Sequence, residues 1–195
     1  MQVVCVVEGH GETQAVPVLL RRVAASVDAS FALQVPPPIR IPRSKLLQPG
    51  ELERAVDLAA RKAGSGGAVF ILLDSDEDCP AVLGPALLAR ARAARGDMRI
   101  GVALAKYEFE AWFLAAAESL GGHRGLRGDL EPPAHPEGVR GAKEWLSERM
   151  VGDHHYVETL DQPALAAVFD LSAARRTDSF EKCWREIARL VSGRQ

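Results

Sequence analysis

The sequence has few cysteines and no marked excess of either charge. Its three cysteines, Cys5, Cys79 and Cys183, lie far apart without any C-x-x-C pair, which excludes a zinc ribbon and a dense disulfide framework. The formal net charge of −2 argues against a generally basic protein that coats nucleic acid. It does not exclude an enzyme that acts on nucleic acid, because metal ions bound to carboxylates reverse the local charge.

Long apolar runs are also missing. None approaches the roughly 20 residues that cross a bilayer, and the segment from Met1 to Val7 enters an apolar strand without the basic region or cleavage site of a signal peptide. We therefore expect a soluble cytoplasmic protein with no membrane partner. A chain of 195 residues with a hydrophobic fraction of 47% suits one compact domain with a substantial core.

Strand-like and helical segments alternate along the first part of the chain. Residues 3–7 and 68–73 are short, continuous apolar runs, which are typical of strands buried on both faces. Further strands are expected near 39–41 and 98–104, and helices near 16–27, 51–63, 83–91 and 109–116. This alternation predicts an α/β fold with a mainly parallel sheet of about four strands and helices on both faces.

The composition changes twice towards the end of the chain. Residues 121–141 are rich in glycine, proline and charge and are interpreted as a loop or linker that follows an α/β domain at 1–120. Residues 142–195 contain helical patterns and are expected to form a C-terminal helical extension packed on the same domain.

Acidic residues follow two of the predicted strands. Glu8 stands at the end of the first and Asp74 at the end of a later one, and the carboxyl ends of parallel strands share one edge of a sheet. Asp76 and Asp78 continue a two-residue spacing that places them on the same side as Asp74 if the backbone stays extended. Glu12 lies in the first turn of the next helix, where the helix dipole favours a carboxylate.

Carboxylates that converge without an equal number of cations repel one another unless they hold protons or bind hard cations. We therefore expect one or two Mg²⁺ or Mn²⁺ ions, a combination suited to phosphodiester chemistry. The expected ligands are Glu8, Glu12, Asp74, Asp76 and Asp78. His10 and Glu110 are candidates for positions around these ligands, with exposed surface positions as the alternative for both.

Two groups of residues resemble known families. Val7-Glu8-Gly9 with Glu12, and Leu73-Asp74-Ser75-Asp76, resemble the signature of the Toprim domain of primases, of type IA and type II topoisomerases, and of the overcoming-lysogenization-defect nucleases. The segment 108–113, with Ser179-Phe180, resembles an uncharacterised bacterial family, the domain-of-unknown-function 4276 family.

The resemblance implies a Toprim-like, Rossmann-like fold and a role for individual residues. Glu8 would be a metal ligand or general acid–base, and Glu12, Asp74 and Asp76 would be metal ligands. Lys106, at the end of a predicted strand, would be a catalytic lysine that stabilises developing negative charge.

Basic residues indicate where nucleic acid would lie. Contacts with the phosphate backbone are expected from Arg40, Arg43, Lys45, Arg175 and Arg176, although short basic clusters also occur as solvated surfaces. His154-His155 beside Asp153 is a second, less specific metal candidate, because no partner cluster accompanies it.

The leading functional hypothesis is a divalent-metal-dependent nuclease-like protein acting on DNA or RNA. The alternative is a non-catalytic Toprim-like module that binds metal or nucleic acid and serves a partner ATPase, in a setting such as phage defence. The sequence has no G-x-x-x-x-G-K-[ST] loop, so an ATPase would be a separate subunit. A receiver-like phosphoryl-transfer protein is less consistent, because Glu8-Gly9 does not supply an acidic pair after the first strand. The oligomeric state is left open.

Overall fold

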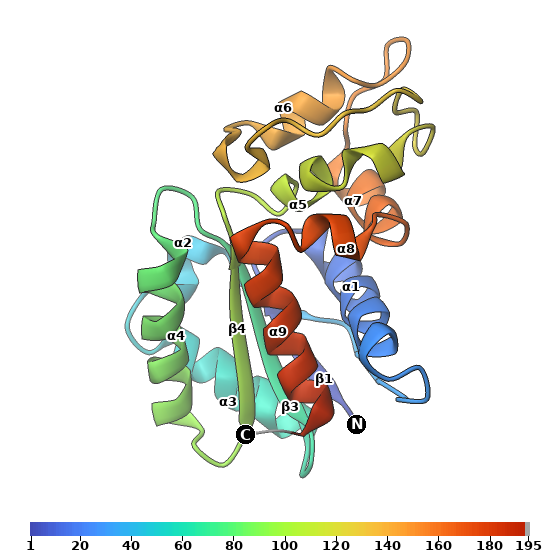
Figure 1. The fold of residues 1–195 in the computed structure, drawn as a ribbon. Helices are drawn as coiled ribbons and strands as arrows, with labels where there is room; N and C mark the ends of the chain where they lie inside the picture. Colours follow the sequence, from blue (N-terminus) through green and yellow to red (C-terminus); the bar gives the residue numbers. More distant parts are fainter. Residues whose placement is uncertain (194–195) are drawn as a thin grey trace.

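The computed structural model describes residues 1–193, and the four strands within them form one all-parallel sheet in the order β2-β1-β3-β4. Figure 1 labels three of these strands, β1, β3 and β4. The strands are β1 (Val3–Val7), β2 (Ile39–Arg40), β3 (Ala68–Asp74) and β4 (Arg99–Ala105). The central strand β3 pairs with β1 from Val3↔Ala68 onwards and with β4 from Ala68↔Arg99 to Asp74↔Ala105. The predicted α/β fold with a parallel sheet is confirmed.

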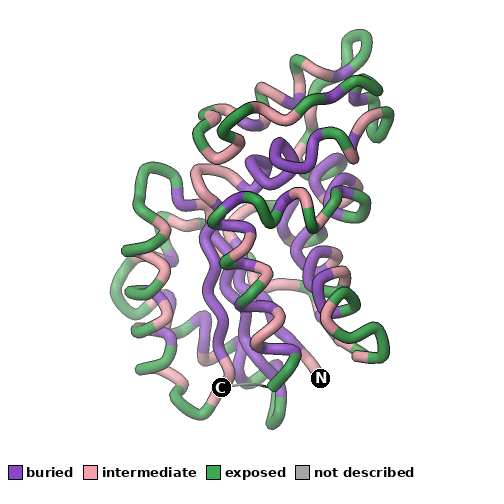
Figure 2. Tube along the Cα trace, viewed as in Figure 1, coloured by how far each residue is buried: buried purple, intermediate pink, exposed green. Residues whose placement is uncertain are grey.

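Helices cover both faces of the sheet, which explains why the strands are continuous apolar runs in the sequence. Alternate residues of β1 point to opposite faces: Cys5 and Val7 belong to one apolar core, and Val4 and Val6 belong to the other. β1, β3 and β4 are accordingly buried along nearly their whole length (Figure 2), whereas the short edge strand β2 (Ile39–Arg40) is partly exposed. One face is covered by α1 (Glu12–Val27) and α9 (Asp178–Ser192), and the other by α2 (Arg43–Leu46), α3 (Glu51–Ala63) and α4 (Pro80–Ala94).

Between β4 and α8 the chain leaves the sheet and forms a layer of short helices over the carboxyl ends of the strands (Figure 1). We call residues 107–170 the cap. Its elements are α5 (Ala111–Ala115), the 3₁₀ turns η1 (Ala117–Leu120) and η2 (Pro136–Gly138), α6 (Ala142–Ser147) and α7 (Glu158–Ala166), and α8 (Leu171–Ala174) leads from it into α9. The cap brings residues that are distant in the sequence over the edge of the sheet where Glu8 and Asp74 lie.

Aromatic and polar contacts hold the cap on the α/β layers. Trp112 and Phe180 meet edge to face with ring centroids 5.1 Å apart, and the indole N–H of Trp112 donates to Ser179 Oγ over 2.7 Å. On α1, the Arg22 guanidinium donates to the carbonyl oxygens of Ala166 and Phe169, each over 2.8 Å. These contacts join α1, α5, α7 and α9 into one body.

The segment 121–141, interpreted from its composition as a loop or linker, contains little regular structure but is tied down at several points. Glu137 Oε1 accepts the backbone N–H of Ser179 over 2.9 Å, and Arg140 forms an ion pair with Glu77. The helices expected in 142–195 are α6, α7, α8 and α9, while residues 194 and 195 of that expected extension lie outside the described residues.

Among residues 1–193, we find no helix that combines the length and the apolar character required to cross a membrane.

Candidate metal centre

Three carboxylates meet at the carboxyl edge of the sheet. Glu8 follows β1, Asp74 is the last residue of β3, and Glu12 is the first residue of α1. Because β1 and β3 are neighbours and run parallel, their ends deliver Glu8 and Asp74 to the same point. One oxygen of each of the three carboxylates lies within 4.8 Å of the others, a spacing that could hold a metal ion.

Backbone hydrogen bonds fix one oxygen of each glutamate. Glu12 Oε2 accepts the N–H groups of Glu8 and Gly9, each over 2.9 Å, and this folds the turn between β1 and α1 around the carboxylate. Glu8 Oε1 accepts the N–H of Asp74 over 3.0 Å and so connects the two strand ends. Asp74 Oδ1 is buried and accepts no hydrogen bond from any described residue.

A buried carboxylate oxygen without a partner is costly unless something outside the protein satisfies it. The candidate metal ligands in this group are all carboxylate oxygens. Mg²⁺ and Mn²⁺ prefer such ligands, whereas soft metals prefer thiolates. The residues present therefore fit a hard divalent cation.

Burial raises the pKa values of all three carboxyl groups, and repulsion from neighbouring carboxylates adds to the rise. Burial raises the pKa of Glu12 to about 8, with the backbone N–H of Gly9 opposing and the charges of Glu8 and Glu110 adding to the rise. Burial also raises the pKa of Asp74 well above its ordinary value, with Glu12, Glu110 and Glu8 contributing repulsion. The pKa of Glu8 is raised chiefly by burial. Without a cation, Glu12 therefore holds its proton at neutral pH, and a divalent cation bound by the three carboxylates would displace it.

Glu110, predicted from the sequence to lie near the ligands, forms a second layer behind them. Its side chain is fully buried, and its Oε1 accepts the phenol O–H of Tyr156 over 2.7 Å and the amide of Gln162 over 3.0 Å. Burial raises the pKa of Glu110 to about 7, although the nearby Lys143 ammonium opposes this shift.

The cap contributes residues that the sequence analysis missed. Lys143 of α6 and Glu158 and Gln162 of α7 line the same cavity of about 260 Å³ as the three carboxylates. Lys143 Nζ lies 3.0 Å from Glu158 Oε2. Burial acts to lower the pKa of Lys143, but the carboxylates of Glu110, Glu158 and Asp74 outweigh it and raise the pKa above its ordinary value.

One sequence signal pointed towards these residues. Gly11 lies in the turn between β1 and α1, and α7 occupies the room that its missing side chain leaves. A Cβ atom at Gly11 would lie 2.5 Å from Gln162 Oε1 and 2.8 Å from the backbone oxygen of Glu158. Glu158 Oε1 also accepts the N–H of Gly11 over 3.2 Å. The glycine is required by the approach of another segment of the chain.

The expected extended backbone through Asp78 is wrong. β3 ends at Asp74, and Asp76 has a φ of +46°, in the left-handed region, so the two-residue alternation stops there. Asp76 and Asp78 both form ion pairs with Arg43, in the case of Asp76 over 3.2 Å, and both are exposed. Neither belongs to the group of three carboxylates, and their role as metal ligands stays a prediction.

Arg43 holds this acidic loop in place. Besides the two ion pairs, its guanidinium donates to the carbonyl oxygens of Asp74 over 3.1 Å and Ser75 over 3.3 Å, and its side chain is only 17% exposed. Arg40 is exposed and donates to the Glu8 carbonyl over 3.3 Å. Both therefore lie beside the cavity, where contact with phosphate stays a prediction.

The remaining predicted residues do not line the acidic cavity. Lys106 lines a different cavity, with its Nζ 4.0 Å from the centroid of the Tyr107 ring. His10 and Lys45 are exposed. Arg175 pairs with Glu181 and covers Trp184, and Arg176 donates to the carbonyl oxygens of Ala173 and Ala115. Within residues 1–193, Asp153, His154 and His155 form no group with the spacing of metal ligands.

Fold and site together define an α/β protein with an acidic centre at the carboxyl edge of a parallel sheet. Residues 7–188 match the family model described as "Domain of unknown function (DUF4276)", and the chain belongs to this family. The matched range contains the three carboxylates and the cap residues around them. Neither the search of curated proteins nor the search of solved structures gave a match.

Proposed function

We propose that this protein is a divalent-metal-dependent, nuclease-like enzyme that acts on phosphodiester bonds of DNA or RNA through a Toprim-like acidic site. The observation that carries the proposal is the buried, unpartnered Asp74 Oδ1 beside Glu8 and Glu12. One or two Mg²⁺ or Mn²⁺ ions held there supply Lewis-acid activation of a phosphate oxygen and of water.

The chain's own residues divide the remaining work. Glu8 uses Oε1 for the Asp74 N–H, and no described residue donates to its Oε2, so that oxygen is free to bind a cation or carry a proton. Glu12 accepts two backbone N–H groups, and these fix the orientation of its carboxylate. Lys143 and Arg43 are the cations that line the cavity, and because Arg43 is already paired with Asp76 and Asp78, we propose that Lys143 attracts the phosphate of the substrate.

The alternative is a non-catalytic module that binds metal or nucleic acid and serves a separate ATPase subunit, for example in phage defence. The pairing of Asp76 and Asp78 with Arg43 favours it, because this leaves three carboxylates at the site. A complete two-ion hydrolytic site normally uses more ligands than a binding site needs.

The test is cleavage of supercoiled DNA, linear DNA and RNA with Mg²⁺, Mn²⁺ or EDTA. The variant is Asp74→Asn, which keeps the side-chain shape and removes the charge. The matched control is Asp129→Asn, because Asp129 is exposed and does not line the cavity. Metal-dependent cleavage that is lost in Asp74→Asn and retained in Asp129→Asn supports the nuclease.

Calorimetric titration with Mn²⁺ separates the two candidates. Binding that depends on Asp74, without cleavage of any substrate, supports the module and refutes the nuclease. If cleavage persists in Asp74→Asn, the activity does not reside at this site.

A further inference from the structure

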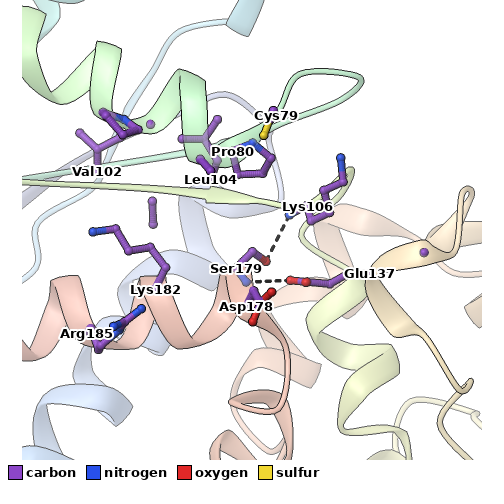
Figure 3. A pocket seen from close by; sticks show the side chains of 15 residues that line it. Cys79, Pro80, Val102, Leu104, Lys106, Glu137, Asp178, Ser179, Lys182 and Arg185 are labelled. Carbon is purple, nitrogen blue, oxygen red and sulfur yellow. Dashed lines mark hydrogen bonds between the residues drawn. The ribbon is translucent and has the colours of Figure 1, made fainter.

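A second cavity, of about 660 Å³, lies along the outer edge of β4, the edge of the sheet opposite β2 (Figure 3). Its floor includes Val102, Ala103 and Leu104, and its walls are the beginning of α4 and the beginning of α9. We call this cavity the edge groove. It shares no residue with the lining of the acidic cavity.

The backbone at the floor of the edge groove has unused hydrogen-bonding groups. Within the described residues β4 pairs only with β3, and Ala105 directs its carbonyl towards β3, where it accepts the Ser75 N–H over 2.8 Å. Successive residues of a strand point their backbone groups to opposite sides, so Val102 and Leu104 point to the outer edge. No described residue bonds to the backbone N–H or C=O of either.

Within residues 1–193, hydrogen bonds close the outer edge of β4 at its two ends. Arg189 donates to the carbonyl oxygen of Ile100 over 2.7 Å, and the Lys106 N–H donates to Ser179 Oγ over 3.2 Å. Both partners come from α9. Between them, Val102 and Leu104 are each 3% exposed and offer two donors and two acceptors with a two-residue repeat. The backbone of an added extended strand has the same two-residue repeat, so its N–H and C=O groups can form hydrogen bonds with these donors and acceptors.

The walls of the groove determine which side chains such a strand would carry. A strand added beside β4 would direct alternate side chains towards α4 and towards α9, because these helices lie on opposite faces of the sheet. The α4 wall is small and uncharged, with Pro80, Ala81, Gly84 and Pro85. Small apolar side chains fit there.

The α9 wall carries positive charge. Lys182 and Arg185 line it, and Lys106 stands at the end of the groove nearest the cap (Figure 3). Lys182 Nζ pairs with Glu186 over 2.6 Å, whereas Arg185 is 64% exposed and its contact with Glu181 is a long one of 3.7 Å, so Arg185 is the less neutralised of the two cations. Of the two carboxylates in the lining, Glu137 already accepts the Ser179 N–H. The chemistry of this wall favours acidic side chains.

The exposed side of α4 beside the groove is also apolar, which is unusual for a solvent-facing helix. Val82 is 71% exposed, and the exposed residues along this side are Ala81, Val82, Pro85, Ala86 and Ala89. A partner seated in the groove would cover this surface as well.

We propose that the outer edge of β4 is a docking site for an extended segment of a partner protein, added as a fifth strand. The segment has small apolar residues facing α4 and acidic residues facing Lys182 and Arg185. The main-chain bonds to Val102 and Leu104 give affinity, and the two walls give specificity. This inference does not depend on the proposed function of the acidic centre.

The experiment uses the whole protein and an end-blocked six-residue peptide of alternating valine and glutamate, titrated by NMR in EDTA. We expect saturable binding and an approximately tenfold slower amide exchange at Val102 and Leu104. Arg185→Glu is expected to weaken binding about tenfold and to improve binding of the matching valine–lysine peptide. Arg61→Glu, an exposed position on α3 outside the groove, is the control and should leave both affinities unchanged.

Four outcomes would overturn the proposal. One is the absence of saturable binding up to about 1 mM of any of these peptides. A second is equal binding by a peptide N-methylated on alternate amides, which cannot pair with the edge. A third is equal affinity of the valine–glutamate peptide for Arg185→Glu. The fourth is concentration-dependent protection of Val102 and Leu104 without peptide, because a second copy of the chain would then occupy the edge.

Discussion

Replacement of Glu12 by glutamine should make the metal-free protein more stable at alkaline pH. Glu12 is 2% exposed, and burial raises its pKa from 4.5 to about 8 in the folded chain. The protonated form is therefore favoured by folding. Its stabilising contribution is fully present below about pH 4.5 and is lost as the pH rises through about 8, because the unfolded chain releases the proton first. Glutamine keeps an oxygen for the Glu8 and Gly9 N–H groups and carries no charge.

The magnitude follows from the two pKa values. A rise from 4.5 to about 8 corresponds to at most about 5 kcal/mol, at about 1.4 kcal/mol per pH unit. The groups interact and share protons, so the observed difference should be smaller, on the order of 2–4 kcal/mol. In EDTA, raising the pH from about 5 to about 9 should therefore lower the free energy of unfolding of the wild type by this amount more than that of Glu12→Gln.

The assay is urea denaturation at both pH values with EDTA and with Mn²⁺. Mn²⁺ should stabilise the wild type most at the higher pH, where the carboxylates have lost their protons, and should stabilise Glu12→Gln less. Glu131→Gln is the matched control, because Glu131 is exposed and lines neither cavity. The reasoning is refuted if Glu12→Gln and the wild type show the same pH dependence in EDTA.

Three other predictions follow from the acidic centre. Asp74→Asn should weaken Mn²⁺ binding, measured by calorimetry, at least about tenfold more than Asp76→Asn does, because Asp76 is exposed and paired with Arg43. A larger loss of affinity in Asp76→Asn would show that the acidic loop rearranges around the ion. Lys143→Met should lower the free energy of unfolding at about pH 9 in EDTA by about 1 kcal/mol, a modest value because the ammonium is partly solvated; unchanged stability would contradict its role in balancing the carboxylates. Tyr156→Phe should lower the free energy of unfolding, measured by urea denaturation, by about 1–3 kcal/mol, because it removes a hydrogen-bond donor from the fully buried carboxylate of Glu110. An unchanged free energy of unfolding would show that Glu110 is protonated and does not need this hydrogen bond.

The strand ends determine where Glu8 and Asp74 lie, and the sequence pattern alone indicates these positions. β1 and β3 are apolar runs buried on both faces, and Glu8 and Asp74 are the first polar side chains after each run or at its end. Once the sheet is parallel and the strands are neighbours, no further information is needed to bring these carboxylates together. The position of Glu12 follows from the turn that starts α1.

The rest of the cavity could not be predicted in the same way, because it depends on how the cap folds. Lys143, Glu158 and Gln162 lie on short helices separated by irregular segments, and nothing in their spacing indicates which carboxylates they face. The error at Asp76 has a local cause. A two-residue period describes an extended strand, and the left-handed turn immediately after β3 ends it.

The position of α9 has a consequence for the synthesis of this chain. The four strands within residues 1–193 are complete once Ala105 has been made, yet the sheet face that carries Phe70 and Ala103 is covered by α1 and by the last helix, which contributes Cys183, Ile187 and Leu190. A nascent or truncated chain that stops before α9 therefore exposes an apolar sheet surface beside an unpaired strand edge. Such a surface is prone to aggregation, so premature termination or cleavage ahead of α9 should direct the product to chaperones and proteases.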